Sequence, residues 1–246
     1  MVKINDDLLI KSLTIDWSRI SSGSYLCKIP AIGSLTDLQF SSPVTCFVGE
    51  NGTGKSTLLE ALAISAGFNP EGGNRNYRFS TYDSHSELHS AVKLARGIHR
   101  PQYGYFLRAE TYYALAIQEE YYSSQPGGNP EHLHKRSHGE GFLTIVEDHF
   151  VPNGLYFLDE PESALSPQSQ LALLYSICEC VSGGSQFFIA THSPILLGIP
   201  NADLLEFDGG EIHRCRYEDT EQYRVMEMFI NHREYVLKQI LEDFEK

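Results

Sequence analysis

Residues 49–56 form a glycine-rich stretch whose residue types and spacing could hold a nucleoside triphosphate. They read Gly-Glu-Asn-Gly-Thr-Gly-Lys-Ser and fill every fixed position of the pattern G-x-x-x-x-G-K-[ST]. Glycines let the backbone N–H groups turn inward around phosphate oxygens. Lys55 would reach the β- and γ-phosphates, and the Ser56 hydroxyl would ligate Mg²⁺.

The segments on either side of this stretch decide whether the match has meaning. Residues 44–48 (VTCFV) are β-branched and aromatic, which indicates a buried parallel strand. Residues 56–65 (STLLEALAIS) are helix formers with an apolar face, and the N-terminus of such a helix attracts anions. A strand, a glycine loop and a helix in this order favour a phosphate loop over a chance glycine-rich turn.

Two further apolar runs end in polar residues that suit the same chemistry. Residues 155–158 (LYFL) are followed by Asp159 and Glu160, and residues 186–190 (QFFIA) are followed by Thr191 and His192. The carboxyl ends of parallel strands meet at one edge of a sheet, beside the phosphate loop. We expect Asp159 to hold Mg²⁺, Glu160 to orient the attacking water, and His192 to contact the γ-phosphate.

With these parts in this order, the sequence resembles the ABC-type ATPases over most of residues 8–215. It looks most like small bacterial ATPases related to the heads of SMC, RecF and DNA-repair proteins. The resemblance implies an α/β P-loop NTPase fold with a mainly parallel core sheet, an antiparallel β edge and a helical signature subdomain. The domain would span 1–220, with the helical subdomain at about 83–150, and 221–246 would form a helical tail.

The resemblance also implies a set of site residues, with ATP and Mg²⁺ as cofactors. Glu160 and His192 would be catalytic, and Ser56, Asp159 and Glu110 would serve the metal. The nucleotide would contact the phosphate loop of one subunit and the signature loop of a second: Gly49, Asn51, Gly52, Thr53, Gly54, Lys55, Ser56 and Thr57, with Ser137, Gly139 and Glu140.

Two departures from the family pattern bear on this assignment. The signature reads Ser-His-Gly-Glu-Gly from Ser137, where the family usually has Leu-Ser-Gly-Gly-Gln. The usual Q-loop glutamine is absent from the end of the apolar run at 104–107, so either Arg108 or Glu110 would take over its sensing role. Both departures favour a member that is not a transporter.

The function implied is that of a cytoplasmic ATPase whose two copies pair head to tail on ATP. The pair would switch a partner in a role of the DNA-repair or phage-defence type. A protein partner is expected first, and nucleic acid stays open. The alternatives are the ATP-binding subunit of a membrane ABC transporter and a nucleotide-gated scaffold that does not hydrolyse ATP.

Composition narrows these choices. The formal net charge is −13, which disfavours sequence-independent DNA binding by the free chain. No apolar run is long enough to span a bilayer, and the N-terminus does not resemble a signal peptide. The five cysteines lie in apolar or strand-like segments and are expected to be buried, reduced thiols. The cations between Lys93 and Arg108 are expected on a solvated helix face rather than at a nucleic-acid site.

The remaining segments predict supporting elements. Residues 8–43 show strand-like alternation, including Tyr25, Cys27 and Ile29, and 83–136 are expected to hold a helix, a strand and another helix. Residues 203–217 indicate a hairpin around Asp208-Gly209-Gly210. The tail from Glu221 is helical with an apolar stripe, for which packing on its own core is favoured over a partner contact.

Overall fold

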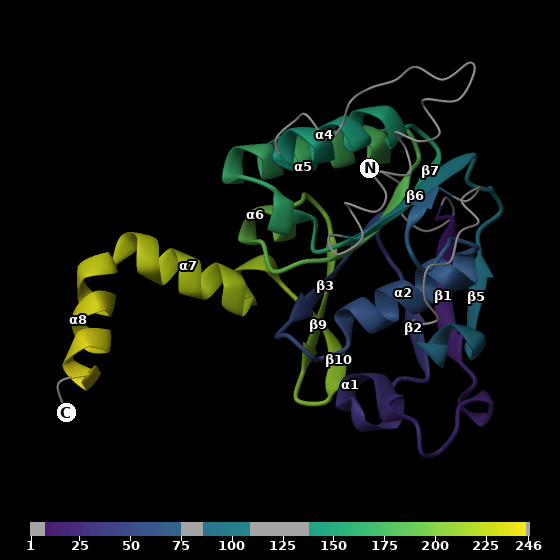
Figure 1. Cartoon of the computed structure of the whole chain (residues 1–246), viewed down its shortest axis with the longest axis horizontal. Coiled ribbons are helices and arrows are strands. Elements are labelled where there is room, and N and C mark those ends of the chain that lie inside the picture. Colours follow the sequence, from purple (N-terminus) through teal and green to yellow (C-terminus); the bar gives the residue numbers. More distant parts are fainter. Residues whose placement is uncertain (1–7, 75–85, 109–137, 245–246) are drawn as a thin grey trace.

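The computed structural model describes residues 8–74, 86–108 and 138–244, and its core is a seven-stranded sheet (Figure 1). The five middle strands are parallel, and β10 and β4 pair antiparallel at the two edges. In spatial order the strands are β10 (Glu211–Cys215), β9 (Asp203–Asp208), β3 (Val44–Gly49), β8 (Gln186–Ala190), β7 (Gly154–Asp159), β6 (Tyr103–Arg108) and β4 (Gly73–Asn74). The predicted α/β class with a mainly parallel sheet is confirmed.

A second, antiparallel sheet of three strands lies on one side. Its order is β2 (Asp37–Gln39), β1 (Ile10–Ile15), β5 (Val92–Arg96). The alternation expected at Tyr25, Cys27 and Ile29 was wrong as a strand, because residues Tyr25–Lys28 form a 3₁₀ turn followed by α1 (Pro30–Gly33). The Ser24 hydroxyl accepts from the Leu26 N–H and caps this turn.

Helices cover both faces of the large sheet. Helix α2 (Lys55–Ala66) lies between the two sheets, and α4 (His138–His149), α5 (Pro167–Ser182) and α6 (Pro194–Leu197) lie on the opposite face (Figure 1). In β7, Leu155 and Phe157 join the core on the α2 side, and Tyr156 and Leu158 join the core on the α4–α5 side. A strand buried on both faces needs apolar side chains on both sides, which explains the apolar runs in the middle of β3, β7 and β8.

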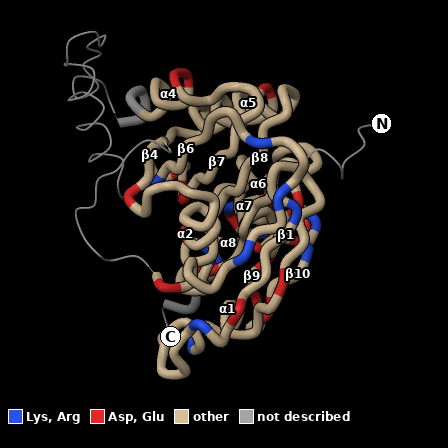
Figure 2. The backbone as a smooth tube through the Cα atoms, turned by 90° about the vertical axis from the view of Figure 1, so that its right-hand side faces the viewer, with Lys and Arg blue, Asp and Glu red and all other residues tan. Residues whose placement is uncertain are grey.

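Of the two helices expected in 83–136, the first was wrong, and the second falls outside the described residues. Within the described part, residues Glu87–Ser90 form a 3₁₀ turn and β5 follows, hydrogen-bonded to β1. The edge of β1 offers backbone N–H and C=O groups, and residues 92–96 pair with them as a strand. Lys93 donates to Asp16 at 2.9 Å and Arg96 donates to the Ser65 carbonyl at 3.2 Å, so these cations contact their own chain. Lys and Arg are interspersed with Asp and Glu along the tube in Figure 2.

The hairpin predicted at residues 203–217 is confirmed. Strands β9 and β10 pair antiparallel across Gly209 and Gly210, whose φ angles are 56° and 85°. Both angles lie in the left-handed region that two-residue hairpin turns require and that glycine adopts without steric cost.

The C-terminal helices α7 (Glu221–Asn231) and α8 (Arg233–Phe244) extend away from the sheets (Figure 1). The expectation that their apolar stripe packs on the core was wrong, because no residue of α7 is buried. An amphipathic pattern fixes which face is apolar but not what covers it. Among the described residues, no helix has the length and apolar character needed to cross a bilayer.

The five cysteines are free thiols in different surroundings. Cys46 and Cys180 are buried, Cys178 and Cys215 are half-buried, and Cys27 is exposed, so the expectation of burial was wrong for Cys27. Burial raises the pKa of the Cys180 thiol to about 11 and that of Cys215 to about 12, which keeps both protonated at neutral pH.

A buried glutamine joins the two sheets. The Gln186 side chain, at the start of β8, accepts from the Ile10 N–H at 2.8 Å and donates to the Ile10 carbonyl at 2.9 Å. Both backbone groups are removed from water, so each needs its partner. This amide holds β1 against the large sheet.

Replacing Gln186 by leucine should lower the free energy of unfolding by about 2–4 kcal/mol, because two buried backbone groups lose their partners. Urea unfolding followed by circular dichroism measures this change. Gln102→Leu, at an exposed position, is the matched control and should stay within about 0.5 kcal/mol of the parent. Equal stability of the two variants would contradict the role of the Gln186 amide.

Candidate functional site

The glycine-rich loop connects the end of β3 to the start of α2 and takes a shape that needs its glycines. Gly49, Gly52 and Gly54 have φ angles of 137°, 81° and 102°. A Cβ at Gly49 would lie 2.7 Å from the Phe207 carbonyl oxygen, and one at Gly54 would lie 2.6 Å from the Ile32 side chain. The loop therefore wraps closely at positions where no other residue fits.

Lys55 lies inside this loop. Its ammonium donates to the carbonyls of Gly49 and Glu50, both at 2.7 Å, and the side chain is buried. Desolvation lowers the Lys55 pKa, and the nearby Glu160 and Asp159 carboxylates oppose that shift. A partly desolvated ammonium surrounded by loop backbone is suited to bind an incoming anion.

A hollow of about 200 Å³ opens beside the loop. Six of the predicted nucleotide-binding residues line it together with Glu160 and Ile29: Asn51, Gly52, Gly54, Lys55, Ser56 and Thr57. Ile29 was not anticipated, because its strand-like context gave no sign that α1 would lie against the loop. The loop, the start of α2 and the end of β7 thus share one concave site.

Ser56 and Asp159 meet directly, although 103 residues separate them. The Ser56 hydroxyl donates to Asp159 Oδ1 at 2.7 Å, and Asp159 is buried at the end of β7. In the described part of the chain no three His, Cys, Asp or Glu side chains gather as a metal site. Mg²⁺ does not need such a cluster, since it binds one or two protein oxygens together with phosphates and waters. The hydroxyl–carboxylate pair fits that role.

Glu160 adopts an unusual backbone conformation. Its φ and ψ are 49° and 50°, in the left-handed region, and its N–H donates to the Ala190 carbonyl of β8 at 2.9 Å. Its own carbonyl accepts from the Ser163 N–H and hydroxyl. Such a conformation costs about 1–3 kcal/mol in a residue with a side chain. It places the Glu160 carboxylate on the wall of the hollow beside Lys55.

His192 follows β8, the neighbour of β7. Its backbone N–H donates to Glu162 Oε1 at 2.5 Å, which fixes the segment beside the carboxylates. His192 Nε2 and Glu162 Oε2 are buried, and neither has a hydrogen-bond partner in the part of the chain that the structure describes. Buried polar atoms without partners are rare in folded proteins, so both atoms are candidates for contact with a bound group.

Two positions next to His192 were missed from the sequence. Glu162 lies two residues after Glu160 in the acidic segment that follows β7, and the sequence pattern gave it no separate role. Gln170 on α5 accepts from the Ser193 hydroxyl at 2.5 Å, and that hydroxyl in turn accepts from the Ile195 and Leu196 N–H groups. The segment after β8 is thus tied to α5 as well as to Glu162.

Arg108 lies at the end of β6, directly opposite Asp159 in the strand register. Its guanidinium donates to Glu60 Oε2 at 2.8 Å and to the Pro70 carbonyl at 3.1 Å, and its Nε lies 3.8 Å from Asp159 Oδ2. Glu60 also accepts from the Ser86 N–H. Of the two residues proposed to replace the Q-loop glutamine, Arg108 lies at the site and Glu110 is outside the described residues.

The signature loop is only partly described. Ser137 lies outside the described residues, and Gly139 and Glu140 are in the first turn of α4. Their predicted contact with a nucleotide in a second subunit stays a prediction.

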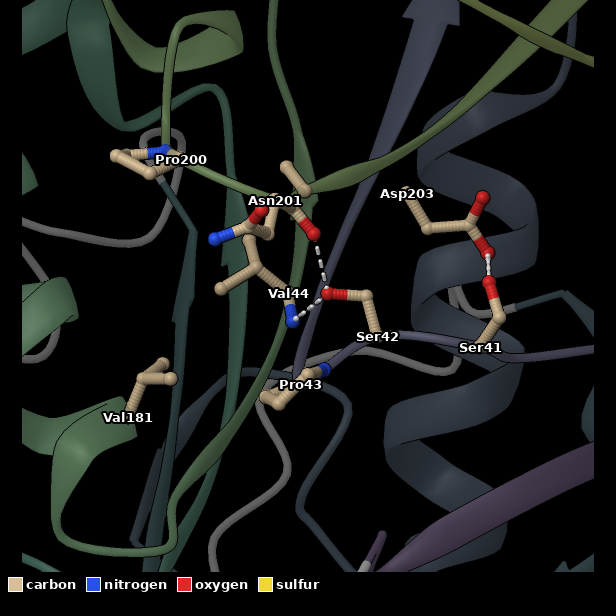
Figure 3. A pocket seen from close by; sticks show the side chains of 9 residues that line it. Ser41, Ser42, Pro43, Val44, Val181, Pro200, Asn201 and Asp203 are labelled. Atoms are coloured by element: carbon tan, nitrogen blue, oxygen red, sulfur yellow. Dashed lines mark hydrogen bonds between the residues drawn. The ribbon is translucent and has the colours of Figure 1, made fainter. Parts of the chain in front are cut away.

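A second hollow, of about 540 Å³, lies at the other end of the sheet (Figure 3). It is formed at the amino ends of β3 and β9, where the Ser42 hydroxyl donates to the Asn201 carbonyl at 2.7 Å and Ser41 donates to Asp203 at 2.8 Å. These polar groups satisfy one another. The cations and carboxylates discussed above lie at the opposite strand ends, so this hollow is not the phosphate site.

Replacing Arg108 by methionine should lower the free energy of unfolding by about 3–5 kcal/mol, because the Glu60 carboxylate is left buried without its cation. Adding Glu60→Gln should recover at least half of that loss, since the neutral amide still accepts from the Ser86 N–H. Chemical denaturation of both variants measures the effect. Arg96→Met is the exposed control, and no recovery in the double variant would contradict the pairing.

Comparisons with known proteins agree with this geometry. A family model described as an AAA domain matches residues 24–122, which include the glycine-rich loop. A second, described as an AAA domain, putative AbiEii toxin, type IV toxin–antitoxin system, matches residues 134–198, which include Asp159, Glu160 and His192. A search of curated proteins gives no match.

Among solved structures, an SMC head domain from Thermotoga maritima is 15% identical, with a TM-score of 0.45 over 85% of this chain and 99% of that chain. An ATP-binding cassette of an ABC transporter in its ADP conformation is 14% identical, with a TM-score of 0.44 over 91% and 98%. A putative metal-chelate type ABC transporter is 19% identical, with a TM-score of 0.41 over 75% and 76%. These likenesses are too weak to indicate a function.

The family models and the site agree with each other. The two matched ranges contain the two halves of the site that the fold brings together: the loop with Lys55 and Ser56, and the strand ends with Asp159 and Glu160. Together the two AAA-domain matches and the geometry of the site support a P-loop ATPase of the ABC/AAA type.

Proposed function

We propose that the chain binds Mg·ATP at the glycine-rich loop and hydrolyses it, and that ATP joins two copies head to tail. The observation that carries the proposal is the Ser56–Asp159 contact, with Glu160 on the wall of the same hollow. A magnesium ligand pair and a candidate base beside one phosphate-binding loop are the parts that phosphoryl transfer to water requires.

Each residue has a distinct role in this proposal. The loop N–H groups and the Lys55 ammonium bind the phosphates, and Ser56 and Asp159 hold the metal. Mg²⁺, when bound, neutralises charge on the phosphate oxygens. Glu160 orients the attacking water and accepts its proton, and His192 holds the γ-phosphate side of the site.

Arg108 is proposed as the sensor that replaces the Q-loop glutamine. It is 3.8 Å from Asp159 and is held by Glu60 on α2, the helix that begins with Lys55 and Ser56. A change at Asp159 on metal binding would therefore alter the balance of charge that holds Arg108. Glu110 is retained as a second candidate for the metal site.

The composite site is proposed to form when Ser137, Gly139 and Glu140 of a second copy meet the nucleotide. Within the described residues, His192 Nε2 and Glu162 Oε2 have no hydrogen-bond partner, and this supports the proposal because a nucleotide or a second copy could supply one. The ATPase domain would span 1–220 with 221–246 as a separate helical tail. Opening and closing of the pair would switch a protein partner, or nucleic acid, in a role of the DNA-repair or phage-defence type.

Hydrolysis is tested by turnover of Mg·ATP by the purified chain. Glu160→Gln should lower kcat by about 10²–10⁴-fold and leave nucleotide affinity unchanged, since the variant loses only the base. Lys55→Ala should lose nucleotide binding itself. Glu179→Gln, on the exposed side of α5, is the matched control and should retain full turnover. Undiminished hydrolysis by Glu160→Gln would exclude Glu160 as the base.

Head-to-tail pairing is tested by cross-linking two different copies. One carries Glu50→Cys within the glycine-rich loop, and the other carries His138→Cys within the signature, both in a Glu160→Gln, Cys27→Ser background. A short bismaleimide should join them only when Mg·ATP is present. A second mixture with Glu179→Cys in place of His138→Cys should give no product. Cross-linking that does not depend on ATP, or none at all, would refute the composite site.

A further inference from the structure

Glu162 connects the segment after β7 to the segment after β8. It lies in the 3₁₀ turn Pro161–Ala164, two residues after Glu160. Its Oε1 accepts from the backbone N–H of His192 at 2.5 Å, across 30 residues of sequence. A hydrogen bond to a carboxylate is shorter and stronger than one between neutral groups. The carboxylate therefore fixes the backbone of the residue proposed to hold the γ-phosphate side of the site.

The Glu162 carboxylate has few other interactions. Among the described residues, the His192 N–H is the only hydrogen-bond donor to it, no cation forms an ion pair with it, and its Oε2 is buried without a partner. A buried carboxylate oxygen without a donor or a cation costs free energy, which a neutral side chain at this position would avoid. The stability of the fold therefore does not account for a carboxylate here.

A second connection holds the other side of His192. The Ser193 hydroxyl donates to Gln170 Oε1 at 2.5 Å, and Gln170 Nε2 donates to the Leu165 carbonyl at 3.1 Å. Leu165 is the residue at which the 3₁₀ turn after β7 ends. His192 is thus held on both sides, directly or through Gln170, by the segment that follows β7.

We propose that Glu162 is a positioning residue, which sets the place of His192 relative to Glu160 through the His192 backbone. This inference rests on the proposed hydrolysis of ATP, in which both side chains act on the same γ-phosphate and water. Glu160 and Glu162 belong to one turn, because the Glu160 carbonyl accepts from the Ser163 N–H at 3.1 Å. The His192 N–H is hydrogen-bonded to that turn, so the two groups keep a fixed spacing.

The charge of Glu162 offers a different route to the phosphate loop. Desolvation lowers the Lys55 pKa, and Glu162 opposes that shift after Glu160 and Asp159. A charge effect on Lys55 would change the binding of the phosphates, whereas a displaced His192 would change the rate of hydrolysis. Among the described residues, the Lys55 ammonium donates to two loop carbonyls and forms no ion pair with Glu162, which favours the positioning role.

Steady-state turnover of Mg·ATP by the full chain tests the proposal. Glu162→Ala should lower kcat by about 10²-fold and change KM by less than about threefold, because His192 loses the contact that places it. Glu162→Gln should stay within about fivefold of the parent kcat, since its amide oxygen still accepts from the His192 N–H. Glu179→Ala, on the exposed side of α5, is the matched control and should keep both parent values.

A double variant shows whether Glu162 acts through His192. Adding Glu162→Ala to His192→Ala should cause no further loss of kcat, because the group that Glu162 positions is already absent. Losses that add in the double variant would overturn the proposal. Parental kcat in Glu162→Ala would overturn it as well, and so would a Glu162→Gln variant as slow as Glu162→Ala, which would assign the effect to charge.

The His192 ring gives a readout that does not depend on turnover. In the nucleotide-free chain with ¹³C-labelled histidine, the His192 Cε1–H resonance is assigned by its loss in His192→Asn. It should move in Glu162→Ala and in Glu162→Asp, whose carboxylate is one methylene shorter, and stay near its parent position in Glu162→Gln. An unmoved resonance in Glu162→Asp would refute the positioning role even if Glu162→Ala does not fold. A parent chain that does not hydrolyse ATP would refute the proposed function instead, and the resonance would still decide whether Glu162 places His192.

Discussion

Like charge is concentrated at the carboxyl edge of the parallel sheet, and the surrounding structure must balance it. Glu60, Asp159, Glu160 and Glu162 gather there with only Lys55 and Arg108 as the described cations among them. Lys55 is held by loop carbonyls, Arg108 by Glu60, and Asp159 by the Ser56 hydroxyl. Carboxylates this close are tolerated only where cations or hydrogen-bond donors reach them. A bound divalent cation would relieve the remaining excess.

The architecture brings these groups together by stacking parallel strands whose polar residues come immediately after their last buried position. Asp159 and Glu160 follow β7, Arg108 ends β6 and His192 follows β8, so groups from distant sequence positions share one edge. Because the strands are buried on both faces, their register leaves little freedom for these ends to shift. The positions of the site residues are therefore a consequence of core packing.

The elements that could be predicted are those whose conformation is determined by residues close together in the sequence. Residues 49–56 contain the glycines that their turn requires, and the strand runs 155–158 and 187–190 are apolar at every position. Arg108 was ambiguous because its role depends on Glu60, which lies 48 residues earlier on α2. The strand at Val92–Arg96 could not be predicted from its own residues, because its backbone partners are on β1, about 80 residues earlier. The exposure of α7 and α8 could not be predicted, because an apolar stripe does not show which surface it will contact.

The left-handed backbone conformation at Glu160 is unfavourable for a residue with a side chain, whereas the proposed chemistry needs a carboxylate at this position. Glycine or asparagine would occupy that conformation at lower cost, so the residue most comfortable at position 160 is one without a usable carboxylate. With Glu160 in its proposed role as the base, stability and catalysis would favour different residues at this position. A lineage of this chain that no longer needed turnover could drift toward a more stable, inactive form by a single substitution there.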